Sequence, residues 1–254
     1  MYPRFARHPI VLAGTFLVYF GLGSLGLALA DINASSTAVW PPSGFALAVL
    51  LLVGLGVWPA VWAGAVFVHF TATGDAPTAL LIGTGNLVQG IIGAVLIERF
   101  AGGVHVFRSA DRIFRFAAIS GLFSTTISAT MAAGALWAQA LVPAADLAYV
   151  WMTLWLGSLT GILVVTPLVL LVATTPVRRP SGLQVVEWLA FMSLLAGVGM
   201  VVFGGFFPSD IKTYPLEFLC VPFFLWVAFR FGPREAAMAM AMLSGIAVWG
   251  TARN

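Results

Sequence analysis

Every second connection between the apolar segments of this chain is rich in arginine. These basic connections contain Arg4, Arg7, Arg99, Arg108, Arg112, Arg115, Arg178, Arg179, Arg230 and Arg234. The alternate connections, around Asp31, Asp75, Asp146 and Asp210, contain no arginine, and the only lysine, Lys212, lies in the last of them. Because short basic loops stay on the cytoplasmic side during membrane insertion, this alternation predicts a multi-pass membrane protein with a cytoplasmic N-terminus.

The composition excludes an ordinary soluble domain. Hydrophobic residues make up 61% of the chain and charged residues 8%, far from the composition of soluble proteins. The net charge of +3 comes from arginines that flank apolar segments, which favours topology anchors over nucleic-acid contacts. A single cysteine, Cys220, excludes an internal disulfide and a cysteine-paired metal site. We expect the lipid bilayer as a partner, and no nucleic acid, metal or cofactor.

A transmembrane helix needs about 20 apolar residues. On that basis we predict single spans at about 10–30, 78–98, 113–138, 147–173, 186–207, 215–230 and 234–252. The apolar stretch 39–73 is too long for one crossing, and Gly54-Leu55-Gly56 predicts a break near its middle. It forms either two short spans or a re-entrant hairpin. We favour two spans, so the predicted fold is an all-α transmembrane helical bundle of about nine spans, with seven spans plus a re-entrant hairpin as the alternative.

Nine spans that start in the cytoplasm would leave Arg253 and Asn254 on the outer side. An output domain in the cytoplasm would then require one more crossing. We therefore expect residues 1–254 to form a single membrane domain that stops before a last span and an output domain, or else a membrane-only protein.

Polar residues inside spans indicate interior faces or functional cavities, because they are costly to leave in lipid. Trp40-Pro41-Pro42-Ser43 opens one span, and its two prolines suit a first helical turn. The motif is either an interfacial anchor or a ligand-facing surface. Asn86 and Gln89, three residues apart on one helix face, form either an interhelical clamp or a polar pocket. Glu217 is either an interfacial carboxylate or a buried proton relay.

Small residues and prolines predict close helix contacts and kinks. Ser120, Ser124 and Ser128 form a row at helical spacing that favours helix packing. Gly157 and Gly161, which follow Trp155, have the spacing of a helix-contact motif. Pro167 and Pro222 are predicted to kink their helices and to free a backbone carbonyl. A carbonyl freed in this way either serves a ligand or is bonded by a neighbouring helix.

The sequence contains no catalytic motif. It has no phosphate-binding loop, no zinc-protease motif and no nucleophile elbow, so we predict that the chain is not an enzyme. His69 is the only histidine in or near a span, and one histidine cannot ligate a haem from both sides. The methionines near the C-terminal end fit flexible core packing better than a copper site.

Several segments follow one another in a distinctive order along nearly the whole chain: Trp40 to Ala48, Trp58-Pro59-Ala60, Gly85-Asn86, Trp155-Leu156-Gly157, Gly161 to Leu168, Tyr214 to Phe218, Phe229 to Gly232, and Arg234-Glu235-Ala236. In this order they resemble the MASE1 family of membrane-associated bacterial sensors. Two positions depart from the family pattern. Ser158 stands where an aspartate is frequent, which weakens any carboxylate site there. Gly54 to Val57 replaces a basic turn, which removes a topology anchor.

The resemblance implies a sensory input domain in the bacterial inner membrane. Such domains precede cytoplasmic histidine kinase, diguanylate cyclase or phosphodiesterase domains, so any enzyme activity would lie outside this chain. A sensor needs two packings whose balance a ligand or partner biases. The partner expected here is an unknown small ligand or a membrane protein, and a homodimer is left open.

Two other classes of function fit parts of the sequence. Broken helices and buried polar residues also occur in transporters. However, the sequence shows no two matching halves and no ion pair within the membrane. A membrane scaffold that binds a partner protein is the third reading. If the chain is a sensor, its site is expected in the outer half of the bundle, between Trp40–Ser43, Asn86, Gln89, Trp155 and Glu217. The competing reading is that these residues only anchor and clamp helices.

Overall fold

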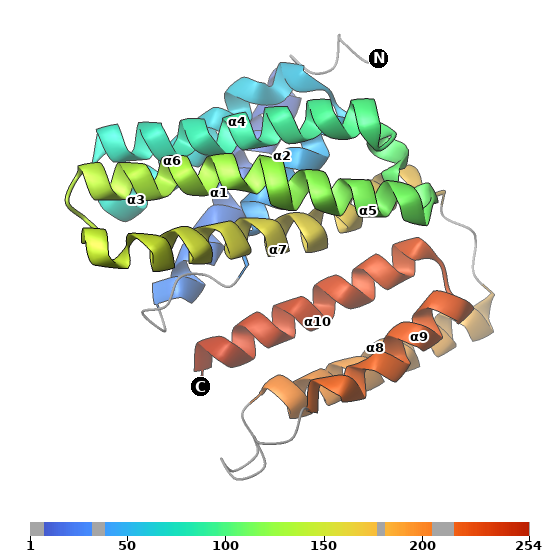
Figure 1. Cartoon of the computed structure of the whole chain (residues 1–254). Coiled ribbons are helices and arrows are strands. Elements are labelled where there is room, and N and C mark those ends of the chain that lie inside the picture. The colour runs from blue at the N-terminus through green and yellow to red at the C-terminus, as the bar shows by residue number, and fades with distance from the viewer. Residues whose placement is uncertain (1–7, 32–38, 177–180, 205–215, 254) are drawn as a thin grey trace. The chain divides into compact units, whose positions relative to one another are not determined.

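The computed structural model describes residues 8–31, 39–176, 181–204 and 216–253, in which every regular element is a helix. The α-helices are α1 (Pro9–Asp31), α2 (Pro41–Leu52), α3 (Trp58–Thr73), α4 (Ala76–Phe100), α5 (Ala110–Ala118), α6 (Thr125–Ala138), α7 (Leu147–Thr174), α8 (Gly182–Phe203), α9 (Val221–Arg230) and α10 (Pro233–Arg253) (Figure 1). The chain forms two compact units, 1–170 and 171–254, and the boundary falls inside α7. The prediction of an all-helical fold is confirmed.

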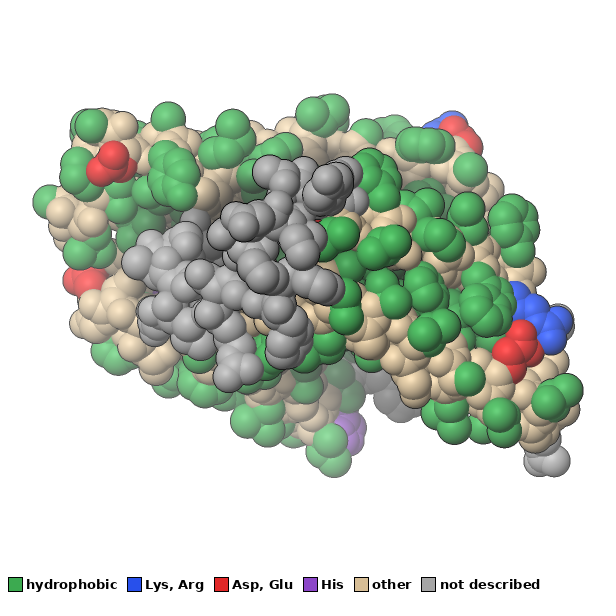
Figure 2. Space-filling view, turned by 90° about the horizontal axis from the view of Figure 1, so that it is seen from below, with side chains coloured by type: hydrophobic (Ala, Val, Ile, Leu, Met, Phe, Trp, Pro, Cys, Tyr) green, Lys and Arg blue, Asp and Glu red, His purple; other side chains and the backbone are tan. Residues whose placement is uncertain are grey.

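Six helical segments are long and apolar enough to cross a membrane. They are Pro9–Ala28, Leu55–Thr73, Ala76–Phe100, Ala110–Ala138, Ala144–Thr174 and Gly182–Phe203. Hydrophobic side chains also cover much of the described surface seen in Figure 2, as a lipid-facing surface requires. The chain is therefore a multi-pass membrane protein.

The other three predicted spans correspond to α2, α9 and α10. With 12 and 10 residues, α2 and α9 are only about 18 and 15 Å long at 1.5 Å per residue, short of a ~30 Å hydrocarbon core. α10 has 21 residues, but its first turn carries Arg234 and Glu235. The structure supports six spans by length and composition, and the count of nine stays a prediction.

The break predicted within 39–73 lies at Gly54. α2 ends where the N–H groups of Val53 and Gly54 donate to the carbonyls of Val49 and Leu50. Gly54 then takes φ 100°, a conformation that L side chains rarely adopt. The short helix η1 (Leu55–Val57) leads from this turn into α3. The two predicted alternatives, a pair of short spans and a re-entrant hairpin, share this break.

A tight turn makes α3 and α4 an antiparallel hairpin. Gly74, at φ 66°, ends α3, and the Asp75 carboxylate caps α4 by accepting from the Thr78 N–H at 2.8 Å. Deeper in the hairpin, Trp62 Nε1 donates to Thr84 Oγ1 at 3.2 Å. We use "the Asp75 end" for the end of the first unit that contains this turn. "The Arg99 end" is the opposite end, where α4 stops.

One helix of the first unit changes its winding. A π-helical segment, η3 (Ile119–Ser124), joins α5 to α6 within a single long span. Such wide turns insert an extra residue and rotate the side chains that follow. Ser124 and Ser128 then face α4, to which both donate hydrogen bonds. The spacing of the serines in the sequence did not predict this π-helical segment.

An ion pair joins α8 to α9 in the second unit. Arg230, the last residue of α9, binds Glu187 in the second turn of α8 through two bonds, Nε–Oε1 at 2.6 Å and Nη2–Oε2 at 2.8 Å. The pair lies in the second turn of α8 and at the last residue of α9, so the expectation of no ion pair within the membrane stays a prediction. The sequence did not show the pair because the partners are 43 residues apart.

Pro222 lies in the first turn of α9, directly after the short helix η6 (Leu216–Cys220). A proline at this position starts a helix, because the N–H that it lacks has no partner within the helix anyway. The kink predicted for Pro222 is thus replaced by a change from one helix type to another. Glu217 is exposed in η6.

Candidate sensing site

The amide of Asn86 links three helices of the first unit. Its Nδ2 lies 3.1 Å from Nε2 of His69 on α3, and its Oδ1 accepts a hydrogen bond from Ser128 Oγ on α6 at 2.7 Å. Helical side chains lean toward the N-terminus of their own helix. Because α3 and α4 are antiparallel, His69 and Asn86 lean toward each other, and this brings them together although they sit at different depths.

The Trp40 side chain adds the N-terminal end of α2 to this group. Its ring stacks on the His69 ring with centroids 5.6 Å apart and an angle of 27° between the planes. Trp40 is only 9% exposed, so most of its ring packs inside the protein. Pro41 and Pro42 follow it in the first turn of α2, as the motif predicts.

The backbone of Trp40 is held by α7. Its N–H donates to the Gly157 carbonyl at 2.7 Å. Gly161 lies so close to the Trp40 carbonyl that any added Cβ would overlap it, and a Cβ on Gly44 would overlap the Gly161 carbonyl. One turn further, Thr166 Oγ1 donates to the Gly44 carbonyl at 2.9 Å. Glycines on both helices therefore permit the approach that positions Trp40, and Pro167 follows directly within α7.

The hydroxyl of Tyr19 lies close to the side chains of Asn86 and Trp40. Tyr19 is fully buried, and its hydroxyl forms no hydrogen bond of acceptable geometry. We call Tyr19, Trp40, His69, Asn86 and Ser128 the Asn86 cluster. It contains no carboxylate, lysine or arginine, so it suits an uncharged hydrogen-bonding group better than an ion.

Ser43 and Gln89 lie beside the Asn86 cluster along the chain, one turn on from Trp40 and Asn86. Both are buried, and neither Ser43 Oγ nor Gln89 Oε1 has a hydrogen-bond partner. The Gln89 backbone carbonyl accepts from Ser124 Oγ at 2.9 Å. Buried polar atoms without partners are costly, so these two groups, like the Tyr19 hydroxyl, have unused capacity to bind.

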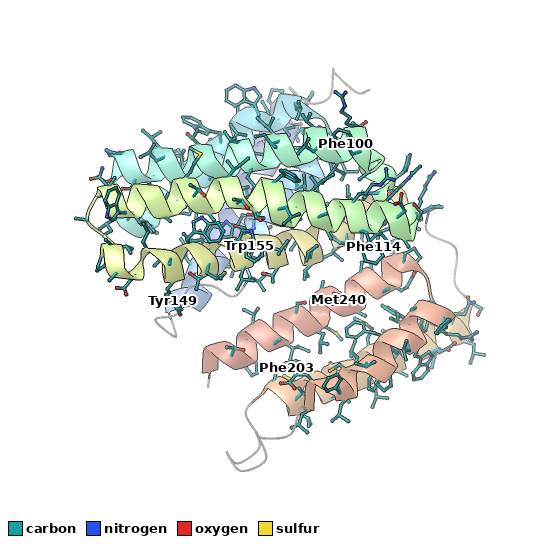
Figure 3. All side chains as sticks on the ribbon, in the orientation of Figure 1. Phe100, Phe114, Tyr149, Trp155, Phe203 and Met240 are labelled. Carbon is teal, nitrogen blue, oxygen red and sulfur yellow. The ribbon has the colours of Figure 1, made fainter. Side chains whose placement is uncertain are left out.

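Two predicted site residues, Trp155 and Glu217, are not members of the Asn86 cluster. Trp155 donates from Nε1 to the Gly121 carbonyl of η3 at 2.9 Å and stacks on Trp151 with centroids 6.2 Å apart (Figure 3). Trp151 in turn donates to Thr130 Oγ1 at 3.0 Å. Both tryptophans thus clamp α7 to the α5–α6 helix. Glu217 belongs to the second unit.

A cavity of about 360 Å³ opens at the Arg99 end, away from the Asn86 cluster. Residues 50–55 line one side of it, and Ala94, Val95, Glu98 and Arg99 line the other. It lies where α2 ends, beside the C-terminal part of α4. None of the predicted site residues lines it.

Sequence reasoning missed three members of the Asn86 cluster as site residues. In the sequence, His69 is a lone histidine unsuited to bind haem, Tyr19 lies within an apolar span, and Ser128 belongs to a row of small residues that favours helix packing. The available signal was that each is polar and lies within a span, but only the packing of the helices shows their common partner. Among the described residues, no group of three histidine, cysteine or acidic side chains could hold a metal ion.

These features define a polytopic helical membrane protein with a buried, uncharged polar cluster. The model of the MASE1 family matches residues 10–254, which covers both units. The chain therefore belongs to the MASE1 family of membrane-associated sensory domains. Neither the comparison with curated proteins nor the comparison with solved structures found a match.

Proposed function

We propose that this chain is the sensory input domain of a bacterial signalling protein in the inner membrane. It detects a small uncharged ligand or a membrane partner and relays the signal to a cytoplasmic histidine kinase, diguanylate cyclase or phosphodiesterase domain. The observation that carries the proposal is the Asn86 cluster. A single amide there connects α3, α4 and α6, so a ligand that competes for that amide changes the packing of three helices together.

The charge distribution supports an orientation for this domain. The four arginines Arg99, Arg108, Arg112 and Arg115 fall between the C-terminal end of α4 and α5, where Arg115 Nη1 donates to the Phe100 carbonyl at 3.1 Å. A basic Arg99 end in the cytoplasm places the N-terminus inside and the Asp75 end outside. The Asn86 cluster then lies toward the outer side, where an external ligand reaches it without crossing the membrane.

The ligand class follows from the unpaired atoms. Tyr19 and Ser43 offer hydroxyls that donate and accept, and Gln89 Oε1 offers an acceptor. The stacked rings of Trp40 and His69 provide a flat wall. A small neutral molecule with at least one N–H or O–H donor matches this set, whereas a free carboxylate or ammonium would lack a counter-charge.

A fusion of the whole chain to a diguanylate cyclase domain tests the proposal through the cyclic dinucleotide produced in cells. Asn86→Leu should abolish the response to conditioned medium or candidate ligands, while protein level and helical content stay near those of the wild type. Gln139→Leu is the matched control, since it makes the same amide-to-leucine change at an exposed position at the end of α6. A wild-type response from Asn86→Leu would contradict this site.

Transport by the same chain is the competing function. Solute flux across vesicles that contain only these 254 residues, with no change in the fused reporter, would replace the sensor proposal by the transporter.

A further inference from the structure

The hydrogen bonds of Asn86 define the tautomer of His69. Asn86 Oδ1 accepts from the Ser128 hydroxyl, so the group that faces His69 is the NH₂, which can only donate. His69 Nε2 must therefore accept. A neutral imidazole with an accepting Nε2 carries its proton on Nδ1.

Protonation of His69 is incompatible with this arrangement. The imidazolium carries a proton on each nitrogen, so Nε2–H and the Asn86 NH₂ would be two donors that face each other over the present 3.1 Å. Either the ring must leave its place against Trp40 or the amide must turn by half a rotation.

A turned amide restores both hydrogen bonds of Asn86. Asn86 Oδ1 then accepts from His69 Nε2–H, and the NH₂ donates to Ser128 Oγ. The displaced Ser128 hydroxyl proton has the carbonyl one turn earlier in its own helix as an acceptor. The Tyr19 hydroxyl, unpartnered beside Asn86, offers an additional acceptor to the second amide hydrogen. The three side chains of His69, Asn86 and Ser128 therefore have one hydrogen-bond pattern for the neutral ring and another for the protonated ring.

We propose that His69 is a proton-binding site, and that its protonation turns Asn86 and so makes this domain a sensor of acidity at the Asp75 end. This inference rests on the proposed sensory function and names the proton as a ligand of the same cluster. The cluster offers the imidazolium no counter-charge, so its stabilisation comes from the stacked Trp40 ring and from the turned Asn86 amide. Unlike other cations, a proton needs no cavity.

The surroundings of His69 contain few competing charges. On the elements packed against α3, the titratable residues are Tyr19 and Asp31 on α1, the α4 cap Asp75, and Glu98 and Arg99 at the far end of α4; α2 and η1 have none. The Trp40 ring, stacked at 5.6 Å, favours the imidazolium through its π face. Asp75 is the nearest carboxylate along the chain, and the Thr73 hydroxyl bridges it to α3 by donating to the carbonyls of His69 and Asp75.

Rotation of the Asn86 amide would change the hydrogen bond that joins α4 to α6. In the neutral pattern Ser128 donates to α4, and in the protonated pattern it accepts. Ser124, one turn away on the same face, holds the Gln89 carbonyl at 2.9 Å. Reversing one bond of this pair changes how α6 is attached to α4 without exposing apolar surface.

Nuclear magnetic resonance of the whole chain in lipid nanodiscs tests the site directly. The chain has 3 histidines, so a His8→Gln/His105→Gln variant leaves His69 as the only source of imidazole ¹⁵N signals. At neutral pH we expect the Nδ1–H tautomer. As the pH is lowered, both nitrogens should become protonated and the Asn86 side-chain amide signals should shift with the same midpoint.

Asn86→Leu supplies the matched variant for the tautomer. Without the amide donor, neutral His69 should show a mixture of tautomers. The proposal is overturned if His69 stays neutral until the helices unfold, if it titrates while the Asn86 signals stay fixed, or if Asn86→Leu leaves a pure Nδ1–H ring.

The cyclase fusion separates this proposal from the proposed function. We expect external acidification to change the output several-fold in the wild type and in His105→Gln, and to have no effect in His69→Gln, whose amide side chain does not titrate. One outcome overturns the proton site alone: the fusion responds to another ligand, but its response to acid is the same in the wild type and in His69→Gln. A fusion that responds to nothing, while the resonance experiment succeeds, overturns the sensory function instead.

Discussion

The hydroxyl of Ser128 donates to Oδ1 of Asn86 at 2.7 Å, whereas the hydroxyl of Ser120, also buried on the same continuous helix, has no partner. Ser128→Ala should therefore destabilise the protein by about 0.6 and at most ~2 kcal/mol, the range of interhelical hydrogen bonds in membranes. Ser120→Ala should be neutral or stabilising, because it removes an unpaired buried group. Unfolding in mixed micelles measures both. Equal losses would show that serine size, and not the bond to Asn86, determines stability.

The contact between α2 and α7 predicts a strict requirement for glycine. Gly161→Ala would place a methyl group against the Trp40 carbonyl, and the overpacking should cost about 1–3 kcal/mol. Gly134→Ala on α6 is the control, since no atom lies within 4 Å of the added Cβ. There the unfolding free energy should stay level or rise by up to ~1 kcal/mol. Thermal denaturation in detergent compares the two, and a tolerant Gly161 would contradict the close approach.

Asp75 should make the stability of the α3–α4 hairpin depend on pH. The Thr78 side chain and backbone N–H beside its carboxylate lower the pKa of Asp75. A lowered folded-state pKa means that the ionised cap stabilises the hairpin above the unfolded value of about 3.9, and that this contribution disappears as the pH falls through the folded value.

Asp75→Asn tests that dependence, because asparagine also caps helices but carries no charge. The wild type should be more stable than this variant at neutral pH and should lose the advantage in strong acid. Hydrogen exchange in the first turn of α4 is the measurement. An advantage that stays constant with pH would show that the carboxylate charge contributes nothing.

We expect the attraction between Glu187 and Arg230 to hold α9 against α8. Reversing one charge, in Glu187→Arg or in Arg230→Glu, should loosen α9 and increase its proteolysis in vesicles. The double reversal should restore protection, because the attraction is the same with the signs exchanged. A double variant as labile as the single ones would mean that packing alone orients α9.

The sequence was sufficient for the features that depend on neighbours along the chain. The apolar lengths predicted helices, Gly54 predicted the break, and Pro41 with Pro42 predicted the start of α2. The number of spans was harder, because α2 and α9 are interrupted by turns that shorten them below a crossing length.

The site was only half predictable for a different reason. Asn86 was conspicuous because an amide in a long apolar helix needs a partner. His69 was not, since its role arises from the antiparallel lean of two side chains at different depths. Trp40 resembles an interfacial anchor in sequence and becomes a buried ring only because α7 has glycines opposite it. Trp155 was expected in the site, but its ring N–H binds a carbonyl of η3. No residue pattern in the sequence predicted this π-helical segment.

The Thr166–Gly44 hydrogen bond connects residues that are 122 positions apart in the sequence. This separation along the chain has a consequence for biogenesis. α2 leaves the ribosome long before α7 exists, so the Trp40 N–H has no Gly157 carbonyl to bind during that interval. An unpaired amide is costly in hydrocarbon, which favours retaining the start of α2 in water or in the insertion machinery until α7 arrives. The N-terminal helices would then be released into lipid as a group, and a ribosome stalled before Gly157 should leave Trp40 open to chemical labelling that the finished protein resists.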